Sequence, residues 1–241
     1  MRRQMVSEFR KLRTTRTAWG LLAGLLALVA IGVGGVLWEA TRAGELTGLP
    51  FLGVPMGIAW AFVLILGLRS FTDEFRFGSI VPTLLADPDR RRVLAAKLLV
   101  NVGAALVFAL SAAVLSFAIG LVWFAVEGAS VQVGLGSLAA WVGKLLVVNV
   151  LWSAIGVGVG LVVRHQVAAI AGTLVAVLVG ENIVGALVPA IAKVLPGEAA
   201  ASIAGLPGAA LTPIVGALVL AIWAVGSLAF GSVLMERRDI A

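Results

Sequence analysis

The chain has 241 residues, of which 61% are hydrophobic and only 12% charged, and its mean hydropathy is +1.11. Ordinary soluble domains carry about 25% charged residues, so this composition excludes them and indicates a membrane protein. The absence of cysteine and the single histidine exclude disulfides, thiol nucleophiles and the usual zinc ligand sets. The net charge of +6 still has to be explained, because basic proteins often bind nucleic acid.

The distribution of the basic residues indicates membrane topology instead. Most of the 18 Lys and Arg residues lie in segments 1–17 and 69–97, at Arg164 and near the end of the chain, all on one side of the spans predicted below. The other side has only Arg42 and Lys193. Loops rich in Lys and Arg stay in the cytoplasm. We therefore expect both termini to be cytoplasmic, membrane lipids to contact the basic side, and nucleic acid not to be a partner.

Apolar runs of about 20 residues are long enough to cross a bilayer, and they predict an all-α membrane protein with six transmembrane helices. We expect residues 1–17 to form an amphipathic helix at the membrane interface and residues 18–241 to form one six-span domain. The protein is then a multi-pass protein of the bacterial cytoplasmic (inner) membrane. The predicted spans are 18–37, 49–68, 98–126, 138–163, 167–188 and 212–235.

The amino-terminal segment has helical spacing of its apolar residues. Met5, Phe9 and Leu12 fall in one stripe, whereas Arg10 and Lys11 lie outside it. Apolar residues in the interface and basic residues near anionic lipid are typical of a helix that lies in the membrane plane. The alternative is a disordered basic tail that only sets the topology.

The segment 69–97, between the second and third spans, is the longest charged stretch. Ser70 or Thr72 can cap a helix, with Asp73 and Glu74 in its first turn, where acids complement the helix dipole. Pro82 would interrupt such a helix. We expect one or two short helices at the cytosolic surface, with aromatic contacts from Phe71, Phe75 and Phe77.

The segment 182–211 is apolar but is broken by Pro189, Pro196 and Pro207. Irregular backbone at membrane depth is tolerated only where protein buries it or where it lines a cavity. A pair of short re-entrant helices that dip from the outer side fits this pattern. An ordinary surface loop with some interfacial helix fits it equally.

The sequence has no signature of catalysis or nucleotide binding. A phosphate-binding loop needs the pattern G-x-x-x-x-G-K-[ST], and Gly143-Lys144-Leu145 lacks both the upstream glycine and the hydroxyl residue. We therefore expect this chain not to be an enzyme, to bind neither a metal nor another cofactor, and to have no energy source of its own.

A few polar or helix-breaking residues lie in or beside the outer halves of the spans, where they are candidates for a transport pathway or an outer gate. Alternatives are a snorkelling lysine and asparagines that join helices. Glu181 is the only acid near a span interior, and a single carboxylate is weak support for coupling to an ion gradient. The candidates are Lys144, Asn149, Glu181, Asn182 and Pro189.

Three patches, residues 7–16, 74–97 and 230–240, occur in a characteristic order. In this order the chain resembles the permease subunits of ABC transporters of the ABC-2 type, particularly the compact bacterial ones. Ser79 stands where the family often has threonine, which keeps the hydroxyl. Glu181 and Asn182 stand where relatives often have a Glu-Pro pair.

The resemblance implies the transmembrane subunit of an ATP-driven exporter. Its partners would be two copies of a cytosolic ABC ATPase, which bind ATP and Mg, and a second permease subunit in a homo- or heterodimer. The interfacial helix, with Met5, Phe9, Arg10, Lys11 and Leu12, would also lie against the ATPase. The implied coupling helix between spans 2 and 3 would dock on the ATPase, and the ATPase-coupling residues would be Phe71, Asp73, Glu74, Phe75, Arg76, Gly78 and Ser79.

Two other functions remain open from the residues alone. One is a gradient-driven secondary transporter or a channel, and the other is a membrane assembly subunit that transports nothing. For Glu74 and Arg76 the alternative to a docking role is a solvated surface pair, since exposed ion pairs are common and contribute little.

Overall fold

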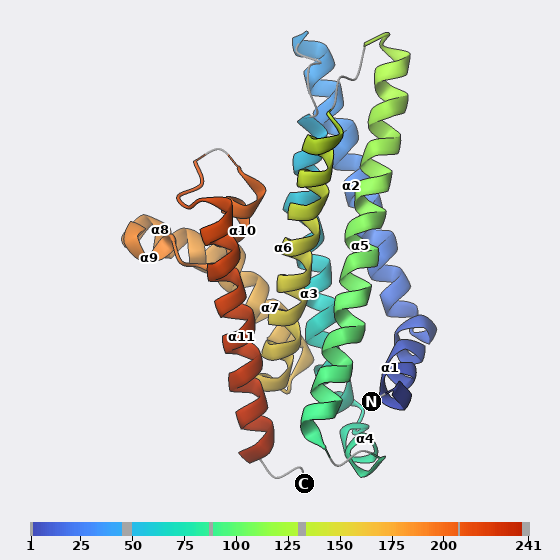
Figure 1. The fold of residues 1–241 in the computed structure, drawn as a ribbon, viewed down its shortest axis with the longest axis vertical. Coiled ribbons are helices and arrows are strands. Elements are labelled where there is room, and N and C mark those ends of the chain that lie inside the picture. The colour runs from blue at the N-terminus through green and yellow to red at the C-terminus, as the bar shows by residue number, and fades with distance from the viewer. Residues whose placement is uncertain (1, 45–49, 87–88, 130–133, 207, 238–241) are drawn as a thin grey trace.

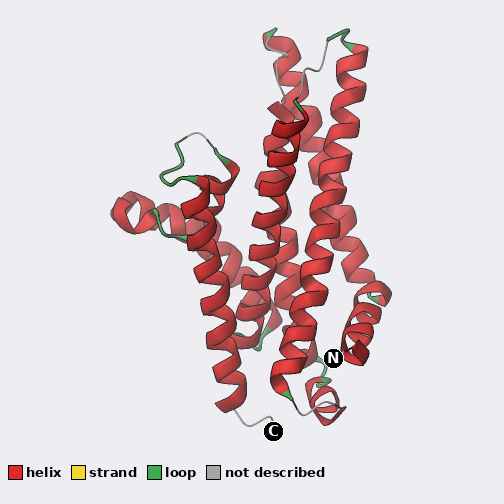
Figure 2. Ribbon diagram, viewed as in Figure 1, coloured by secondary structure: helices red, strands yellow, loops and turns green. Residues whose placement is uncertain are grey.

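A computed structural model describes residues 2–44, 50–86, 89–129, 134–206 and 208–237. These residues are helical along nearly their whole length, and short loops join the helices (Figures 1 and 2). Residue 49, where the second span was predicted to begin, and residues 238–240 of the carboxy-terminal patch lie outside the described residues.

Six of the helices are long and apolar enough to cross a membrane, which confirms the predicted all-α, multi-pass membrane protein. One of them, Gln166–Leu187, consists of α7 (Gln166–Val175), a π-helical turn η2 (Ala176–Gly180) and α8 (Glu181–Leu187). The other five are α2 (Arg16–Ala43), α3 (Gly53–Arg76), α5 (Arg90–Val126), α6 (Leu135–Val162) and α11 (Pro213–Arg237).

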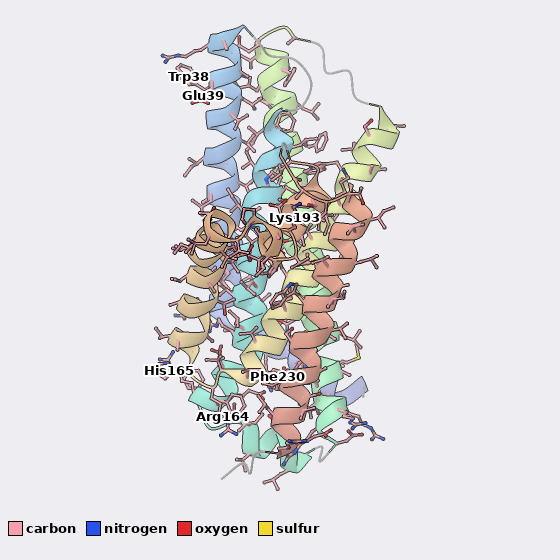
Figure 3. All side chains as sticks on the ribbon, turned by 90° about the vertical axis from the view of Figure 1, so that its left-hand side faces the viewer. Trp38, Glu39, Arg164, His165, Lys193 and Phe230 are labelled. Atoms are coloured by element: carbon pink, nitrogen blue, oxygen red, sulfur yellow. The ribbon has the colours of Figure 1, made fainter. Side chains whose placement is uncertain are left out.

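The remaining elements are short. Helix α1 (Arg2–Thr14) and helix α4 (Ile80–Ala86) lie at the end of the bundle where the described chain also begins and ends (Figure 1). The amino-terminal segment is therefore a helix and not a disordered tail. Figure 3 shows Arg164 and His165 toward the same end and Trp38 and Glu39 at the opposite end. The other short elements are η1 (Pro50–Leu52), α9 (Pro189–Ala192) and α10 (Pro196–Ala204).

Several helices extend beyond the predicted spans, because hydropathy places the end of a span at its first charged residue and a helix can continue past the hydrocarbon core. The second spanning helix continues beyond residue 68 to Arg76, so no new helix begins at Ser70 or Thr72. The third begins at Arg90, eight residues before the predicted start, because Asp89 caps it by accepting hydrogen bonds from the backbone N–H groups of Arg91 and Arg92.

The one short helix described between α3 and α5 is α4, and it contains the proline that was expected to interrupt a helix. Pro82 is the third residue of α4, where a backbone N–H has no partner within the helix, so the missing donor costs little. The chain turns from α3 into α4 at Gly78, whose φ of +67° favours glycine.

Helix α6 is the most buried of the six and forms the centre of the bundle. It approaches α3 at backbone distance because both helices carry glycine at the crossing. A Cβ on Gly67 would lie 2.5 Å from the carbonyl oxygen of Ser153, and one on Gly156 would collide with that of Leu64. Gly160 meets Leu68 in the same way. Gly156 and Gly160 therefore pack inside the bundle, where small residues let helices approach closely.

The segment after α7 turns away from the bundle axis at η2, as Figure 1 shows. Val188 breaks the helix with φ −140° and ψ 79°, and Pro189 and Pro196 then occupy the first positions of α9 and α10. The predicted short helices are thus present. Figure 3 shows Lys193, which follows α9, well below Trp38 along the bundle.

Candidate functional site

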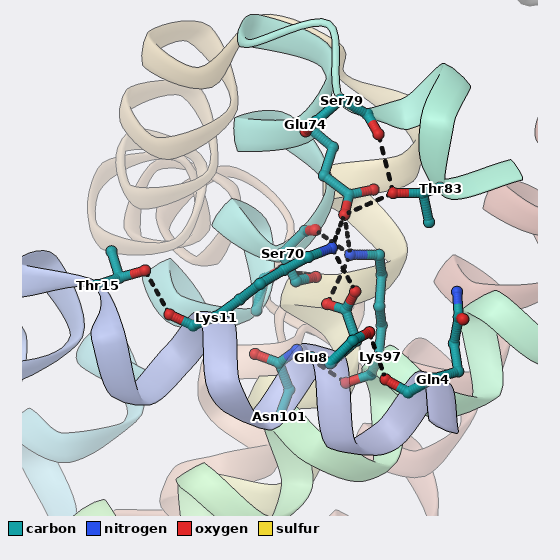
Figure 4. Close-up of polar contacts among 12 residues, drawn as sticks. Gln4, Glu8, Lys11, Thr15, Ser70, Glu74, Ser79, Thr83, Lys97 and Asn101 are labelled. Atoms are coloured by element: carbon teal, nitrogen blue, oxygen red, sulfur yellow. Dashed lines mark hydrogen bonds and ion pairs between the residues drawn. The ribbon is translucent and has the colours of Figure 1, made fainter. Parts of the chain in front are cut away.

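A group of charged side chains joins α1, α3 and α5 at the end of the bundle that carries both chain ends (Figure 4). Lys97 of α5 lies at its centre. Its Nζ atom donates to Glu8 Oε2 of α1 at 2.8 Å, to Glu74 Oε1 of α3 at 2.8 Å, and to the carbonyl oxygen of Ser70 at 2.9 Å. All three N–H groups of this ammonium therefore have an acceptor.

A second cation completes the group, which we call the ionic junction: Glu8, Lys11, Glu74 and Lys97. The Nζ atom of Lys11 lies 2.6 Å from Glu8 Oε1 and 2.7 Å from Glu74 Oε1. The hydroxyl group of Thr83, on α4, reaches the same Glu74 oxygen at 3.5 Å. Two ammonium groups thus alternate with two carboxylates, and four helices meet at the junction.

Three members of the ionic junction are buried. Lys97 is 1% exposed, Glu74 5% and Glu8 6%. A charged group away from water is tolerated only where opposite charges and hydrogen bonds replace its hydration. The ring of Phe71 covers the ammonium of Lys97 at 5.1 Å from the ring centroid. Removing any one of these charges would leave its buried partners with one counterion fewer.

The ion pairs shift the titration of the two α1 members. Burial alone would raise the pKa of the Glu8 carboxyl, but Lys97 and Lys11 outweigh it and hold this pKa below its ordinary value of 4.5. Burial alone would lower the pKa of Lys11, but its hydrogen bonds to Glu74 and Glu8 raise that pKa above 10.5. Both groups are therefore charged at neutral pH.

Sequence reasoning missed two members of the ionic junction, Glu8 and Lys97. A signal was present for each. Lys97 directly precedes the longest apolar run of the chain, and Glu8 is the one acid in a basic segment. Isolated charges of opposite sign in an apolar setting tend to pair. The sequence could not show that segments 89 residues apart are neighbours.

The predicted ATPase-coupling residues separate into a buried and an exposed group. Phe71 and Glu74 are buried inside the chain. Glu74 is turned inward because its counterions Lys11 and Lys97 lie there. The exposed members are Arg76 and Gly78, and the half-exposed members are Asp73, Phe75 and Ser79.

The exposed part of this region carries apolar side chains. Phe77 is 70% exposed and Leu85 80%, and Val81 of α4 is also exposed. Arg76, the last residue of α3, donates to Gln166 at 2.7 Å, which joins the end of α3 to the start of α7. We call Phe77, Val81 and Leu85 the α4 patch.

The α1 residues expected at the interface differ in their exposure. Phe9, Arg10 and Lys11 are exposed, whereas Met5 and Leu12 are half-buried. Leu12 packs against the main hydrophobic core. In the apolar stripe of α1, Met5 and Leu12 are thus partly covered, whereas Phe9 is exposed.

A second candidate region is a cavity of about 550 Å³ toward the other end of the bundle. Trp60 of α3 and Trp152 of α6 stack in its wall, with ring centroids 4.7 Å apart. Glu181 and Glu198 supply two carboxylates to its lining. Such a site, apolar and aromatic with few charges, resembles the sites that bind amphipathic molecules.

Of the predicted pathway residues, Glu181 and Asn182 line this cavity, and Lys144, Asn149 and Pro189 are not among its lining residues. The two oxygens of Glu181 accept the backbone N–H of Gly197 at 3.1 and 2.8 Å, so Glu181 caps the amino terminus of α10. At the other end of α10, a Cβ on Gly205 would lie 3.4 Å from Lys144 Nζ.

The side chains of the two predicted asparagines each donate a hydrogen bond to the backbone four residues earlier. Asn149 is fully buried in α6 and donates to the carbonyl oxygen of Leu145 at 2.8 Å. Asn182 donates in the same way to Leu178 at 2.7 Å.

Within the described part of the chain, no three acidic or histidine side chains gather as metal ligands. No family model and no curated protein matches this chain.

Proposed function

We propose that this chain is the transmembrane permease subunit of an ATP-driven ABC exporter, powered by two cytosolic ATPase subunits that bind ATP and Mg. The observation that carries the proposal is the ionic junction, which ties α1 and the base of α4 to the spanning helices α3 and α5 (Figure 4). A protein that is driven from outside the membrane needs such a stiff connection between its contact surface and its spans.

The α4 patch is the proposed contact surface. Phe77 and Leu85 have exposed apolar side chains, and α4, which carries Leu85, lies at the end of the bundle that also holds α1 (Figure 1). Exposed apolar groups rimmed by polar residues mark sites of protein association. We assign direct docking on the ATPase to this patch and to α1. The buried residues Phe71 and Glu74 then connect the patch to the bundle.

The helix packing supports a route for the motion. Helix α3 carries Glu74 of the ionic junction at one end and Trp60 of the outer cavity toward the other. Between them it meets α6 at backbone distance through Gly67 and Gly156, so the two helices move as one body. ATP-driven closure of the ATPases does work on the spans only if its contacts with the patch differ between the two states.

The orientation follows from charge. The end with α1 and α4 carries most of the basic residues and is proposed to face the cytoplasm of a bacterial cell, with both termini, while Trp38 faces outward. Helix α1 would then lie at the inner membrane interface. Helices α9 and α10 would be re-entrant, because Lys193 lies well below Trp38 along the bundle (Figure 3).

The outer cavity is proposed as one half of the translocation path, and a second permease subunit would supply the other half. Only 6% of the helix Gln166–Leu187 is buried in this chain, although it contributes Glu181 and Asn182 to the cavity. A second copy packed there would enclose the path and shield the carboxylate from lipid.

The test is assembly with a candidate ABC ATPase co-expressed with the chain. Leu85→Asp and Phe77→Asp should abolish copurification of the ATPase, because a charge in the centre of an apolar contact is desolvated without a partner. Val126→Asp is the control, since Val126 is equally exposed but lies at the end of α5 far from α4. Normal ATPase binding by both patch variants, or uphill transport by the purified chain alone, would contradict the proposal.

A further inference from the structure

A separate cavity of about 340 Å³ lies beside the ionic junction, between α1, α2, α3 and α5. Its lining combines equal numbers of the two charges: the cations are Lys11, Arg69 and Lys97, and the carboxylates are Glu8, Asp73 and Glu74. A lining with no net charge favours neither an anion nor a cation alone. It suits a neutral or zwitterionic occupant.

Three oxygen atoms in this lining have no hydrogen-bond donor within the described structure: Asp73 Oδ1, Glu74 Oε2 and Asn101 Oδ1. Glu74 is only 5% exposed and Asn101 only 3%. A buried acceptor without a donor is unfavourable, so an occupant of the cavity should bring N–H or O–H groups. A primary ammonium group brings three N–H donors and a charge that the carboxylates favour.

The cavity also borders the start of α2, where backbone N–H donors lack acceptors in the part of the chain that the structure describes. Thr15 and Thr17 line the same cavity, and the N-cap residue Thr15 makes no side-chain cap. The backbone N–H groups of Arg16 and Thr17 have no acceptor among the described residues. The start of a 28-residue helix with free N–H groups favours an anion such as phosphate. The ammonium of Lys11, which also lines the cavity, adds positive charge.

The rest of the lining is apolar and includes Leu12, Leu21 and Leu66. Leu21 and Leu66 belong to helices that are long enough to span the membrane. A ligand with a polar head among the charges and a hydrocarbon chain along these leucines would match both parts of the cavity.

We propose that this cavity binds a phospholipid whose headgroup ends in a primary ammonium group. The ammonium lies among the charges of the lining, where it donates to Asn101 Oδ1, and the phosphate lies at the start of α2. A choline headgroup has no N–H to donate, and a glycerol headgroup would put a net negative charge beside the carboxylates. The inference is independent of the proposed transport function.

The experiment uses the full-length protein in mild detergent and measures lipid retention by native mass spectrometry. The probes are lipids with identical acyl chains and with ethanolamine, N-methyl, N,N-dimethyl or choline headgroups, which lose one N–H donor at each step. Retention should fall along the series by about tenfold or more in total, because hydrogen bonds to charged groups are lost. Equal retention of ethanolamine and choline lipids, or stronger retention of a phosphatidylglycerol, would overturn the proposal.

The structure offers a matched pair of variants for the same measurement. Asn101 and Asn149 are both buried, both donate to the carbonyl oxygen four residues earlier at 2.8 Å, and both have an unpartnered Oδ1. Only Asn101 lines the cavity. Asn101→Leu should therefore reduce the preference for ethanolamine over choline at least severalfold, and Asn149→Leu should leave it unchanged. If both variants keep the preference, or both lose it equally, the lipid is bound elsewhere and the proposal is wrong.

Discussion

Lys97 on α5 and Glu8 on α1 are 89 residues apart in the sequence, yet their Nζ and Oε2 atoms lie 2.8 Å apart. Both side chains are almost completely withdrawn from water. An ion pair of this kind contributes little net stability compared with apolar residues, but it strongly opposes the removal of either partner. It therefore specifies one position for α1 on the bundle, which a purely apolar contact would define less sharply.

The first prediction concerns this pair. Lys97→Met should lower the free energy of unfolding by about 3–5 kcal/mol, because Glu8 and Glu74 remain buried and lose the buried one of their two shared cations. The measurement is the unfolding midpoint of the protein in detergent. Arg91→Gln is the control: it removes an ion pair of 3.0 Å with Glu236 that is largely exposed, and it should cost less than about 1 kcal/mol. Similar losses in both variants would contradict a special role for Lys97.

The second prediction is the pH range over which α1 stays docked. The lowered pKa of Glu8 gives a stabilisation that is fully present above pH 4.5 and is lost as the pH falls through the folded value. The raised pKa of Lys11 gives one that is present below pH 10.5 and is lost as the pH rises through its folded value. Docking should therefore be constant between these limits.

Proteolysis at a site engineered at residue 15 measures this docking. Cleavage should be slow and constant between about pH 5 and 10 and should accelerate outside this range, provided that the protease rate is corrected for pH with an unfolded substrate. In Glu8→Gln the acid limb should disappear and cleavage should be fast throughout. A steep change near pH 6 or 7 would contradict the assignment.

The sequence predicted the spans well and the ionic junction poorly, for one physical reason. Hydropathy reports where a helix leaves the hydrocarbon core, so α6 and α11 were placed within a few residues. It does not report helices that continue beyond the core, as α3 does to Arg76. Charges such as Glu74 then seemed to belong to a surface loop. Their burial depends on Lys11 and Lys97 from distant segments, and a single sequence does not contain that pairing.

In the segment from η2 to α10, the sequence likewise predicted some features and missed others. Pro189 and Pro196 correctly predicted breaks, because proline begins helices and cannot continue them. The π-helical turn Ala176–Gly180 had no sequence signal, since its residues are as apolar as those that precede it. Glu181 was noticed as an isolated acid, but its partner, the backbone of Gly197, has no side chain that a sequence pattern could reveal.

The third prediction tests the glycine contacts in the bundle centre. Gly156→Ala should destabilise the protein by several kcal/mol or prevent folding, because the new methyl group would collide with the backbone of Leu64, which cannot move independently. Gly57→Ala is the control, since a Cβ there meets nothing within 4 Å, and it should be neutral or slightly stabilising. The unfolding midpoint and the yield of monodisperse protein distinguish the two.

The fourth prediction tests the proposed orientation. The chain has no native cysteine, so single-cysteine variants are unambiguous. In intact cells an impermeant thiol reagent should label Arg42→Cys, at the end near Trp38, and should not label Arg91→Cys until the membrane is opened. The reverse pattern would invert the topology, and equal labelling of both would indicate mixed insertion.

The last prediction concerns Glu181, the one acid expected within a span. If its role is to cap α10, Glu181→Ala should weaken that helix by about 0.5–2 kcal/mol, and amide exchange at Gly197 should accelerate severalfold. Glu181→Gln, which keeps an acceptor oxygen, should have a smaller effect. Glu198→Ala serves as the control: Glu198 accepts from the backbone N–H of Ala210 at 2.7 Å, so exchange should accelerate there and not at Gly197. Unchanged exchange at Gly197 in Glu181→Ala would leave the carboxylate free for a role in the path itself.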